Sequence, residues 1–242
     1  MSEAKEKPTA RIIKCTVLGE DMKGESYENK PHISAFAGDM NFMVPYILGG
    51  GPPSQRNADG TTILHAAVDG WQYRMVEFLV LSGAKVNAQN KHGDTPLHAI
   101  VRSRDIPFEG QFLRHIAPED ARKETFRMLL RHHADPSILN MQGANALHLA
   151  AYEGDQVAIV ELLPGGRMLS IDAVTSKGAT ALLLAILQEH VACVKRLIAF
   201  GADVNFQYKN DITPLRLLYS SENPELRALC NTQNTKRIEP EN

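Results

Sequence analysis

The chain has 242 residues, of which 43% are hydrophobic and 22% charged, and its formal net charge is −2 at pH 7. These values are ordinary for a folded protein, and the near-neutral charge gives no general attraction to nucleic acid or to an anionic membrane. No segment approaches the roughly 20 apolar residues of a membrane-spanning helix, and the polar N-terminus lacks the apolar core of a secretion signal. The three cysteines are too scattered for a disulfide framework or a zinc site, which favours a reducing, intracellular compartment.

One short sequence signature recurs along the chain with a nearly constant spacing. It reads GTTILH at residues 60–65 and returns at Gly93, Gly143, Gly178 and Asp211, after 33, 50, 35 and 33 residues. A second marker, GAKVN at residues 83–87, returns in the same phase as GADVN at residues 201–205. Two signals with one shared period indicate a stack of repeated units.

The combined pattern resembles the ankyrin repeat. The family pattern of Gly-x-Thr-Pro-Leu-His, then Val-x-x-Leu-Leu, then Gly-Ala-Asp-Val-Asn is legible from about residue 57 to residue 210. This resemblance implies an all-α solenoid, in which each unit is two short antiparallel helices with a projecting β-turn. It predicts four complete repeats between degenerate N-terminal and C-terminal capping repeats.

The predicted segments follow one another along the chain. In chain order they are a polar leader (1–28), a degenerate capping repeat (29–56), ankyrin repeats at 57–89, 90–139, 140–174 and 175–207, a truncated capping repeat (208–230) and a disordered tail (231–242). The leader is polar except for residues 12–18, IIKCTVL. It is either disordered, or this apolar run adds an edge segment to the capping repeat.

Each inner helix is predicted to begin at a residue that caps its first turn. Thr62, Thr95, Thr180 and Thr213 stand at this point, with Asn145 in the equivalent place. Their side-chain oxygens can accept a hydrogen bond from a free backbone N–H group. Each outer helix carries an apolar stripe at i, i+3 and i+4, which only a stacked neighbour can cover.

Two departures from the repeat pattern bear on function. The repeat at 90–139 carries 17 extra residues, at about 104–120, which include Phe108 and Phe112. They form either a tolerated surface loop, since closure entropy grows slowly with loop length, or a partner-binding loop or small helix. Trp71 replaces the glycine that is usual between the two helices, and it either packs against the array or serves as a surface anchor.

His65, His98 and His148 recur at one structural position, which raises the question of a metal site. Successive helices stack about 8–10 Å apart, too far for shared zinc ligation at about 2.0–2.1 Å. The resemblance to ankyrin repeats implies instead that these histidines link neighbouring turns by hydrogen bonds. No catalytic residue, metal or cofactor is predicted, because the sequence has no phosphate-binding loop, nucleophile elbow or zinc-binding histidine pair.

The resemblance also implies a concave binding face, made of turn tips and inner-helix surfaces. Arg, Tyr, Met and Trp are enriched at interface cores, and apolar side chains at exposed positions have no folding role. On these grounds Arg102, Met141, Tyr152 and Leu187 are the main predictions. The full set of predicted partner-binding residues is Asp69, Trp71, Lys91, His92, Arg102, Phe108, Phe112, Met141, Tyr152, Glu153, Leu187 and Gln188.

One asparagine matches a modification pattern that the family resemblance implies. Leu197, Asp203, Val204 and Asn205 have the spacing favoured by the asparaginyl hydroxylase that acts on ankyrin repeats, so Asn205 is a predicted hydroxylation site. The alternative is that Asn205 only ties its turn together through side-chain hydrogen bonds.

These features predict a protein-interaction scaffold, an adaptor or inhibitor that binds a protein partner through the concave face and the insertion. The chain is expected to be monomeric when free and to lie in the cytoplasm, the nucleus or both, with no nucleic acid or membrane as partner. An inhibitor of a transcription factor, similar to the NF-κB inhibitors, is one form of this function, although a fold does not define a function. The alternative from another class is an enzyme or ligand-binding protein with a polar pocket near the insertion.

Overall fold

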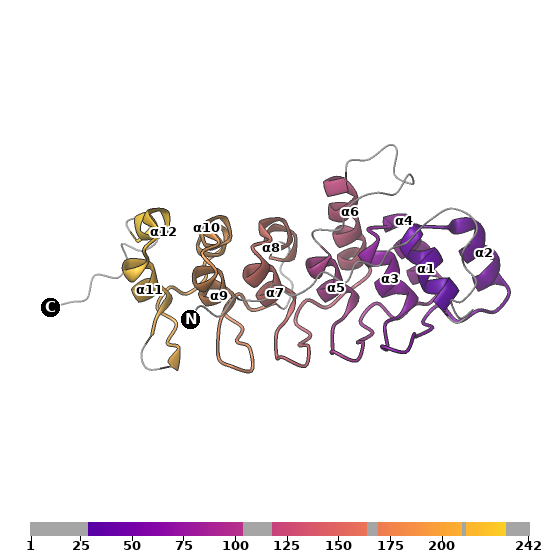
Figure 1. Cartoon of the computed structure of the whole chain (residues 1–242), viewed down its shortest axis with the longest axis horizontal. Helices are drawn as coiled ribbons and strands as arrows, with labels where there is room; N and C mark the ends of the chain where they lie inside the picture. Colours follow the sequence, from indigo (N-terminus) through magenta and orange to yellow (C-terminus); the bar gives the residue numbers. More distant parts are fainter. Residues whose placement is uncertain (1–28, 104–117, 164–168, 210–211, 231–242) are drawn as a thin grey trace, which may run out of the picture.

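The computed structural model describes residues 29–103, 118–163, 169–209 and 212–230. In these ranges, pairs of antiparallel helices stand side by side in chain order and form an elongated stack (Figure 1). The inner helices are α1 (Lys30–Ala37), α3 (Ile63–Asp69), α5 (Pro96–Arg102), α7 (Ala146–Glu153), α9 (Ala181–Leu187) and α11 (Pro214–Ser220). The outer helices are α2 (Met40–Leu48), α4 (Tyr73–Leu81), α6 (Pro118–Arg131), α8 (Gln156–Leu162), α10 (Val191–Ala199) and α12 (Pro224–Leu229).

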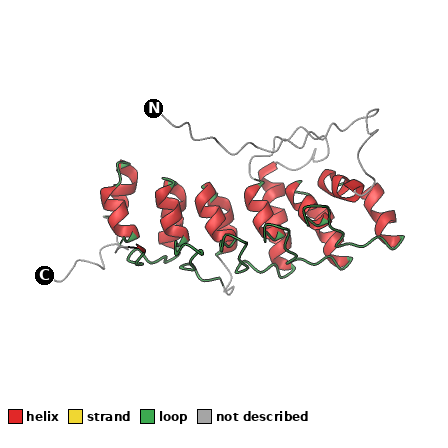
Figure 2. Ribbon diagram, turned by 60° about the horizontal axis from the view of Figure 1, so that its bottom comes forward, coloured by secondary structure: helices red, strands yellow, loops and turns green. Residues whose placement is uncertain are grey.

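The predicted all-α solenoid is therefore confirmed. Consecutive inner helices pack against one another, and the loops between units project together from one edge of the stack (Figures 1 and 2). Isolated antiparallel bridges, such as Arg56 with Thr62 and Val174 with Thr180, close the bases of these loops. No helix in the described ranges is long and apolar enough to cross a membrane.

The inner helices begin at the predicted capping residues. The side chains of Thr62, Thr180 and Thr213 accept hydrogen bonds from backbone N–H groups three residues later, at 3.4, 3.3 and 3.2 Å. Asn145 does the same for the N–H group of His148, at 3.0 Å. Each cap satisfies a backbone donor that the helix itself leaves free. These caps therefore fix where α3, α7, α9 and α11 start.

The core is a continuous apolar layer between the inner and outer helices. The predicted outer-helix stripe is buried at most of its positions, for example at Val76, Leu79, Phe126 and Leu197, each 0% exposed. The same layer continues through the inner-helix residues of every unit. Stability thus comes from the contact between neighbouring units, as expected for a repeat protein.

Trp71 is a packing residue, which corrects its inclusion among the predicted partner-binding residues. Its side chain is 6% exposed, and its indole N–H donates a hydrogen bond to the Ser103 hydroxyl at 3.2 Å. Trp71 also has φ of 54°, in the left-handed region that the equivalent Gly38 and Gly154 adopt with φ of 72° and 74°. The bulky side chain accepts this unfavourable backbone because it fills the space between two repeats.

The long outer helix α6 holds an ion pair in the interior. Arg122 of α6 donates to the Ile100 carbonyl of α5 at 3.0 Å and to the carboxylate of Asp155, the residue that caps α8. The two side chains are 7% and 2% exposed. The Arg122 guanidinium also lies 5.3 Å from the Phe126 ring centroid. These contacts join α5 and α6, the two helices on either side of the insertion, to the start of α8 in the next unit.

Candidate partner-binding surface

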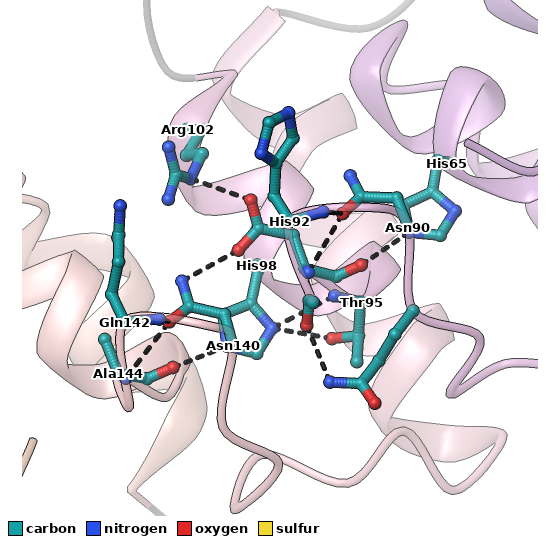
Figure 3. Close-up of polar contacts among 12 residues, drawn as sticks. His65, Asn90, His92, Thr95, His98, Arg102, Asn140, Gln142 and Ala144 are labelled. Atoms are coloured by element: carbon teal, nitrogen blue, oxygen red, sulfur yellow. Dashed lines mark hydrogen bonds and ion pairs between the residues drawn. The ribbon is translucent and has the colours of Figure 1, made fainter. Parts of the chain in front are cut away.

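A ladder of buried histidines sets the distance between neighbouring units (Figure 3). The Nδ1 atom of His98 lies 3.2 Å from the backbone N of Thr95 and accepts its hydrogen, while Nε2 donates to the Ala144 carbonyl of the next unit at 3.1 Å. His65 makes the matching contacts, with Nε2 3.0 Å from the Asp94 carbonyl. His148 repeats them, with Nε2 2.8 Å from the Ala173 carbonyl.

These histidines are neutral structural residues. Burial lowers the pKa of His65 to about 4, and burial also lowers the pKa of His98 and His148. A neutral imidazole is what the ladder requires, because Nδ1 must accept while Nε2 donates. The hydrogen-bonding role expected from the family resemblance is confirmed by these contacts.

A second set of contacts shapes the projecting turns. The side-chain oxygen of Asn90 accepts from the backbone N–H groups of His92 and Asp94 at 2.8 and 3.0 Å, and Asn140 holds the next turn in the same way (Figure 3). The amide of Asn140 also donates to the Asp94 carboxylate at 2.9 Å. The turn tips are thus rigidly placed, so Lys91 and His92 are presented to solvent in fixed positions.

Four of the predicted partner-binding residues form one row along the stack. Asp69, Arg102, Tyr152 and Leu187 each stand four residues after the third residue of their inner helix, so they occupy equivalent positions in successive units. We call this row, with the turn-tip residues Lys91, His92 and Met141, the inner face. Glu153 and Gln188 follow the row by one residue and are exposed.

The middle and C-terminal part of the inner face is apolar. Met141 is 78% exposed, Tyr152 48% and Leu187 56%. Met141 lies in the turn before α7, Tyr152 lies in α7 and Leu187 in α9 of the next unit, and none of them is needed to fill the core. Large apolar side chains gathered on one surface are typical of an interaction site.

The N-terminal part of the inner face is charged. The Arg102 side chain is 45% exposed, and its Nε lies 3.3 Å from a carboxylate oxygen of the buried Asp94 (Figure 3). Asn140 occupies the other oxygen of Asp94. Any partner that contacts Arg102 therefore meets a guanidinium that is already paired with the Asp94 carboxylate.

Asp69 differs from Asp94 in having no such partner among the described residues. It ends α3 and is half-buried. Burial, together with repulsion from the Asp94 carboxylate, raises the pKa of Asp69 to about 7. A carboxyl group that titrates near neutral pH on the inner face can respond to an approaching cation.

The remaining predicted residues fall elsewhere. Phe108 and Phe112, with most of the insertion, lie outside the described residues; of the insertion, only residues 118–120 are described, as the first turn of α6. The backbone N–H of Asn205 donates to the Asp203 side chain at 2.8 Å, and Asn205 is half-buried. Its predicted hydroxylation stays a prediction.

Sequence reasoning missed His32, the first member of the histidine ladder. Its Nε2 lies 2.9 Å from the Thr61 carbonyl of the next unit, and it is 7% exposed. Its Nδ1 has no hydrogen-bond partner among the described residues, and Asn29, which precedes α1, makes no side-chain capping bond. The sequence does place a histidine at the third position of α1, as in the later repeats, but the residues around it no longer match the repeat pattern.

Comparison with known proteins agrees with this geometry. Residues 31–109 and 113–208 match the family model for ankyrin repeats in three copies. The chain belongs to the ankyrin-repeat family. An ankyrin repeat domain from Acinetobacter baumannii has a similar structure, with a TM-score of 0.68 at 26% identity over 84% of this chain and 96% of that one.

Two curated ankyrin-repeat relatives are much longer than the part that this chain matches. The mouse RelA-associated inhibitor is 34% identical over 82 residues, which is 34% of this chain and 10% of that protein. The chicken nuclear factor NF-kappa-B p105 subunit is 35% identical over 143 residues, which is 58% of this chain and 13% of that protein. The ankyrin-repeat architecture of this chain is that of a protein-interaction scaffold.

Proposed function

We propose that this chain binds a segment of a partner protein along its inner face, across α3, α5, α7 and α9. The observation that carries the proposal is the set of exposed side chains at Met141, Tyr152 and Leu187, which come from two successive units. With units about 8–10 Å apart, an extended segment of roughly eight to ten residues would reach from Asp69 to Leu187.

The charge of the inner face supports a partner segment with a basic residue near one end. Asp94 is already bonded to Arg102 and Asn140, whereas Asp69 is not bonded among the described residues. A Lys or Arg side chain beside Asp69 would favour its ionised form and remove an unpaired carboxyl from the interface. Apolar side chains of the same segment would then cover Tyr152 and Leu187.

Inhibition of a transcription factor is one form of this function. It is supported by two relatives whose names refer to RelA and to NF-kappa-B. Such a role would place the chain in the cytoplasm, the nucleus or both. An enzyme remains the alternative from another class, and no group of three or more potential metal ligands lies in the described ranges to support it.

The proposal is tested on the partner that the wild-type chain captures by cross-linking in a cell extract, and in parallel on purified RelA. The variant Tyr152→Ala with Leu187→Ser removes two exposed side chains of the inner face. Loss of one interface hot spot costs about 2 kcal/mol or more, so the affinity should fall at least about 30-fold. The matched control, Leu81→Ser with Phe200→Ser, removes residues that are 73% and 43% exposed at the ends of outer helices, and it should bind as the wild type does.

Equal binding by the inner-face variant and the control would refute the proposed site. Deletion of residues 104–117 forms the third arm of the experiment. If this deletion alone abolishes binding while the inner-face variant binds normally, recognition belongs to the insertion. Thermal unfolding of each variant checks that the loss of affinity is not a loss of fold.

A further inference from the structure

Helix α2, at the N-terminal end of the described stack, is apolar on most of its surface, which is unusual for a helix in this place, and Asn41 is its one exposed polar side chain. Its nine residues, MNFMVPYIL, include no charged side chain, and only Met43 is fully buried. Leu48 is 80% exposed, and Val44 and Ile47 are only partly covered. A helix that is apolar all round is normally enclosed by other parts of a protein.

The other described parts of the chain do not enclose α2. The later outer helices, from α4 to α12, each pack against a neighbouring outer helix, whereas α2 makes at most a marginal contact with α4. Its main neighbour in the described ranges is α1, on one side (Figure 1). Met43, Tyr46 and Ile47 pack toward the core, so Val44, Pro45 and Leu48, beside the exposed Asn41, form a second and largely apolar face, which we call the outer α2 face.

We propose that residues 12–18 of the leader, IIKCTVL, pack on the outer α2 face and complete the N-terminal cap. This run holds four large aliphatic side chains and one charge, in a leader that is otherwise polar. Residues 19–28 link Leu18 to Asn29, which precedes α1. At up to about 3.3–3.6 Å per residue this linker spans more than the roughly 13 Å length of α2.

The covalent link favours the leader over other occupants. A short flexible linker holds its segment at an effective concentration near the millimolar range, far above that of a separate protein. The insertion, the other apolar segment outside the described ranges, joins α5 to α6 two units away. The C-terminal tail, NTQNTKRIEPEN, has no apolar run.

Cysteine cross-linking tests this arrangement in the full chain, since Cys15 lies in the middle of the leader run. In the Leu48→Cys variant, mild oxidation should form a disulfide between positions 15 and 48 within one chain, at a rate independent of protein concentration. A disulfide requires Cα atoms about 4.4–6.8 Å apart, so it reports close contact. The control is Leu81→Cys on α4, also strongly exposed at 73%, which should cross-link at least tenfold more slowly.

A second measurement does not depend on a cross-link. Replacing the four aliphatic residues of the run by serine should increase amide hydrogen exchange of α2 at least tenfold and leave α10 unchanged. The change Leu48→Ser should have the same effect. Combining it with the leader substitutions should increase exchange little further, because both changes remove the same contact between the leader and α2.

Equal rates of cross-linking to Cys15 in the Leu48→Cys and Leu81→Cys variants, or unchanged exchange in α2, would overturn the proposal. A cross-link that joins two chains would assign the outer α2 face to a second copy instead. The outcome is independent of the proposed function, because the inner face lies on α3, α5, α7, α9 and the turns between them, and α2 contributes no residue to it.

Discussion

Asp69→Asn should stabilise the protein at alkaline pH and have little effect at acidic pH. In the folded chain, burial and the nearby Asp94 raise the pKa of Asp69 from 3.8 to about 7. In the unfolded chain the carboxyl group loses its proton near its ordinary pKa. The folded state therefore holds an extra proton between about pH 4 and pH 7, and the free energy of unfolding falls as the pH rises through this interval.

The magnitude follows from the size of the shift. Each pKa unit corresponds to about 1.4 kcal/mol, so a shift of about 3 units sets an upper limit of about 4 kcal/mol at pH 8. Asp69 is only half-buried, and water can reach its carboxyl group in part. We therefore expect Asp69→Asn to gain on the order of 1–2 kcal/mol at pH 8, and close to nothing at pH 4.

The assay is urea unfolding at several values between pH 4 and pH 8.5, followed by tryptophan fluorescence. Trp71, the single tryptophan, is buried two residues from Asp69 and reports on its unit. The low pKa of His65 also makes stability depend on pH, with loss as the pH falls below about 6.5, but it is common to both proteins and cancels in the difference.

The control is Asp59→Asn, at an exposed turn tip, which should change stability by less than about 0.5 kcal/mol at every pH. A difference between wild type and Asp69→Asn that does not change with pH would refute the reasoning. So would a variant less stable than the wild type at pH 8.

Three further predictions rest on buried contacts or backbone strain, and each is measured by urea unfolding at pH 7. His98→Ala should lower the free energy of unfolding by about 2–4 kcal/mol, because it removes a buried ring and leaves a carbonyl of the next unit unpaired. The control His92→Ala, at an exposed position, should lower it by less than about 0.5 kcal/mol. Equal losses in the two variants would contradict the structural role of the histidine ladder. Arg122→Met should cost about 3–5 kcal/mol by leaving the Asp155 carboxylate buried without its cation, and adding Asp155→Asn should recover at least about 1 kcal/mol, so no recovery would count against the ion pair. Glu189→Gly should stabilise by about 0.5–1 kcal/mol, since Glu189 is exposed and has φ of 57°; a loss of stability would mean that this backbone carries no strain.

Most of the fold could be predicted from the sequence because its determinants are local. A capping residue such as Thr62 lies three residues from the N–H group that it binds, and the apolar stripe of an outer helix lies within one helix. Repetition then multiplies a weak signal, since the same short pattern returns in unit after unit. The histidine ladder could be recognised for the same reason.

The inner face could be predicted only in part. Met141, Tyr152 and Leu187 are exposed as expected, because their positions follow from the repeat register. The register does not show how side chains from different units pair with one another. The bond between Arg102 and Asp94, and the absence of a comparable partner for Asp69 among the described residues, became visible only in three dimensions.

The sequence by itself determined the repeat, the helix starts and the core positions, because each depends on residues a few positions apart. The tertiary structure decided the features that depend on stacking. It placed Trp71 against Ser103, 32 residues away, and Arg122 against Asp155, 33 residues away. It also raised the pKa of Asp69 by placing it in a half-buried position beside Asp94. Burial and charge pairing depend on which side chains the neighbouring units bring together. A local sequence pattern does not show which residues of different units will be in contact.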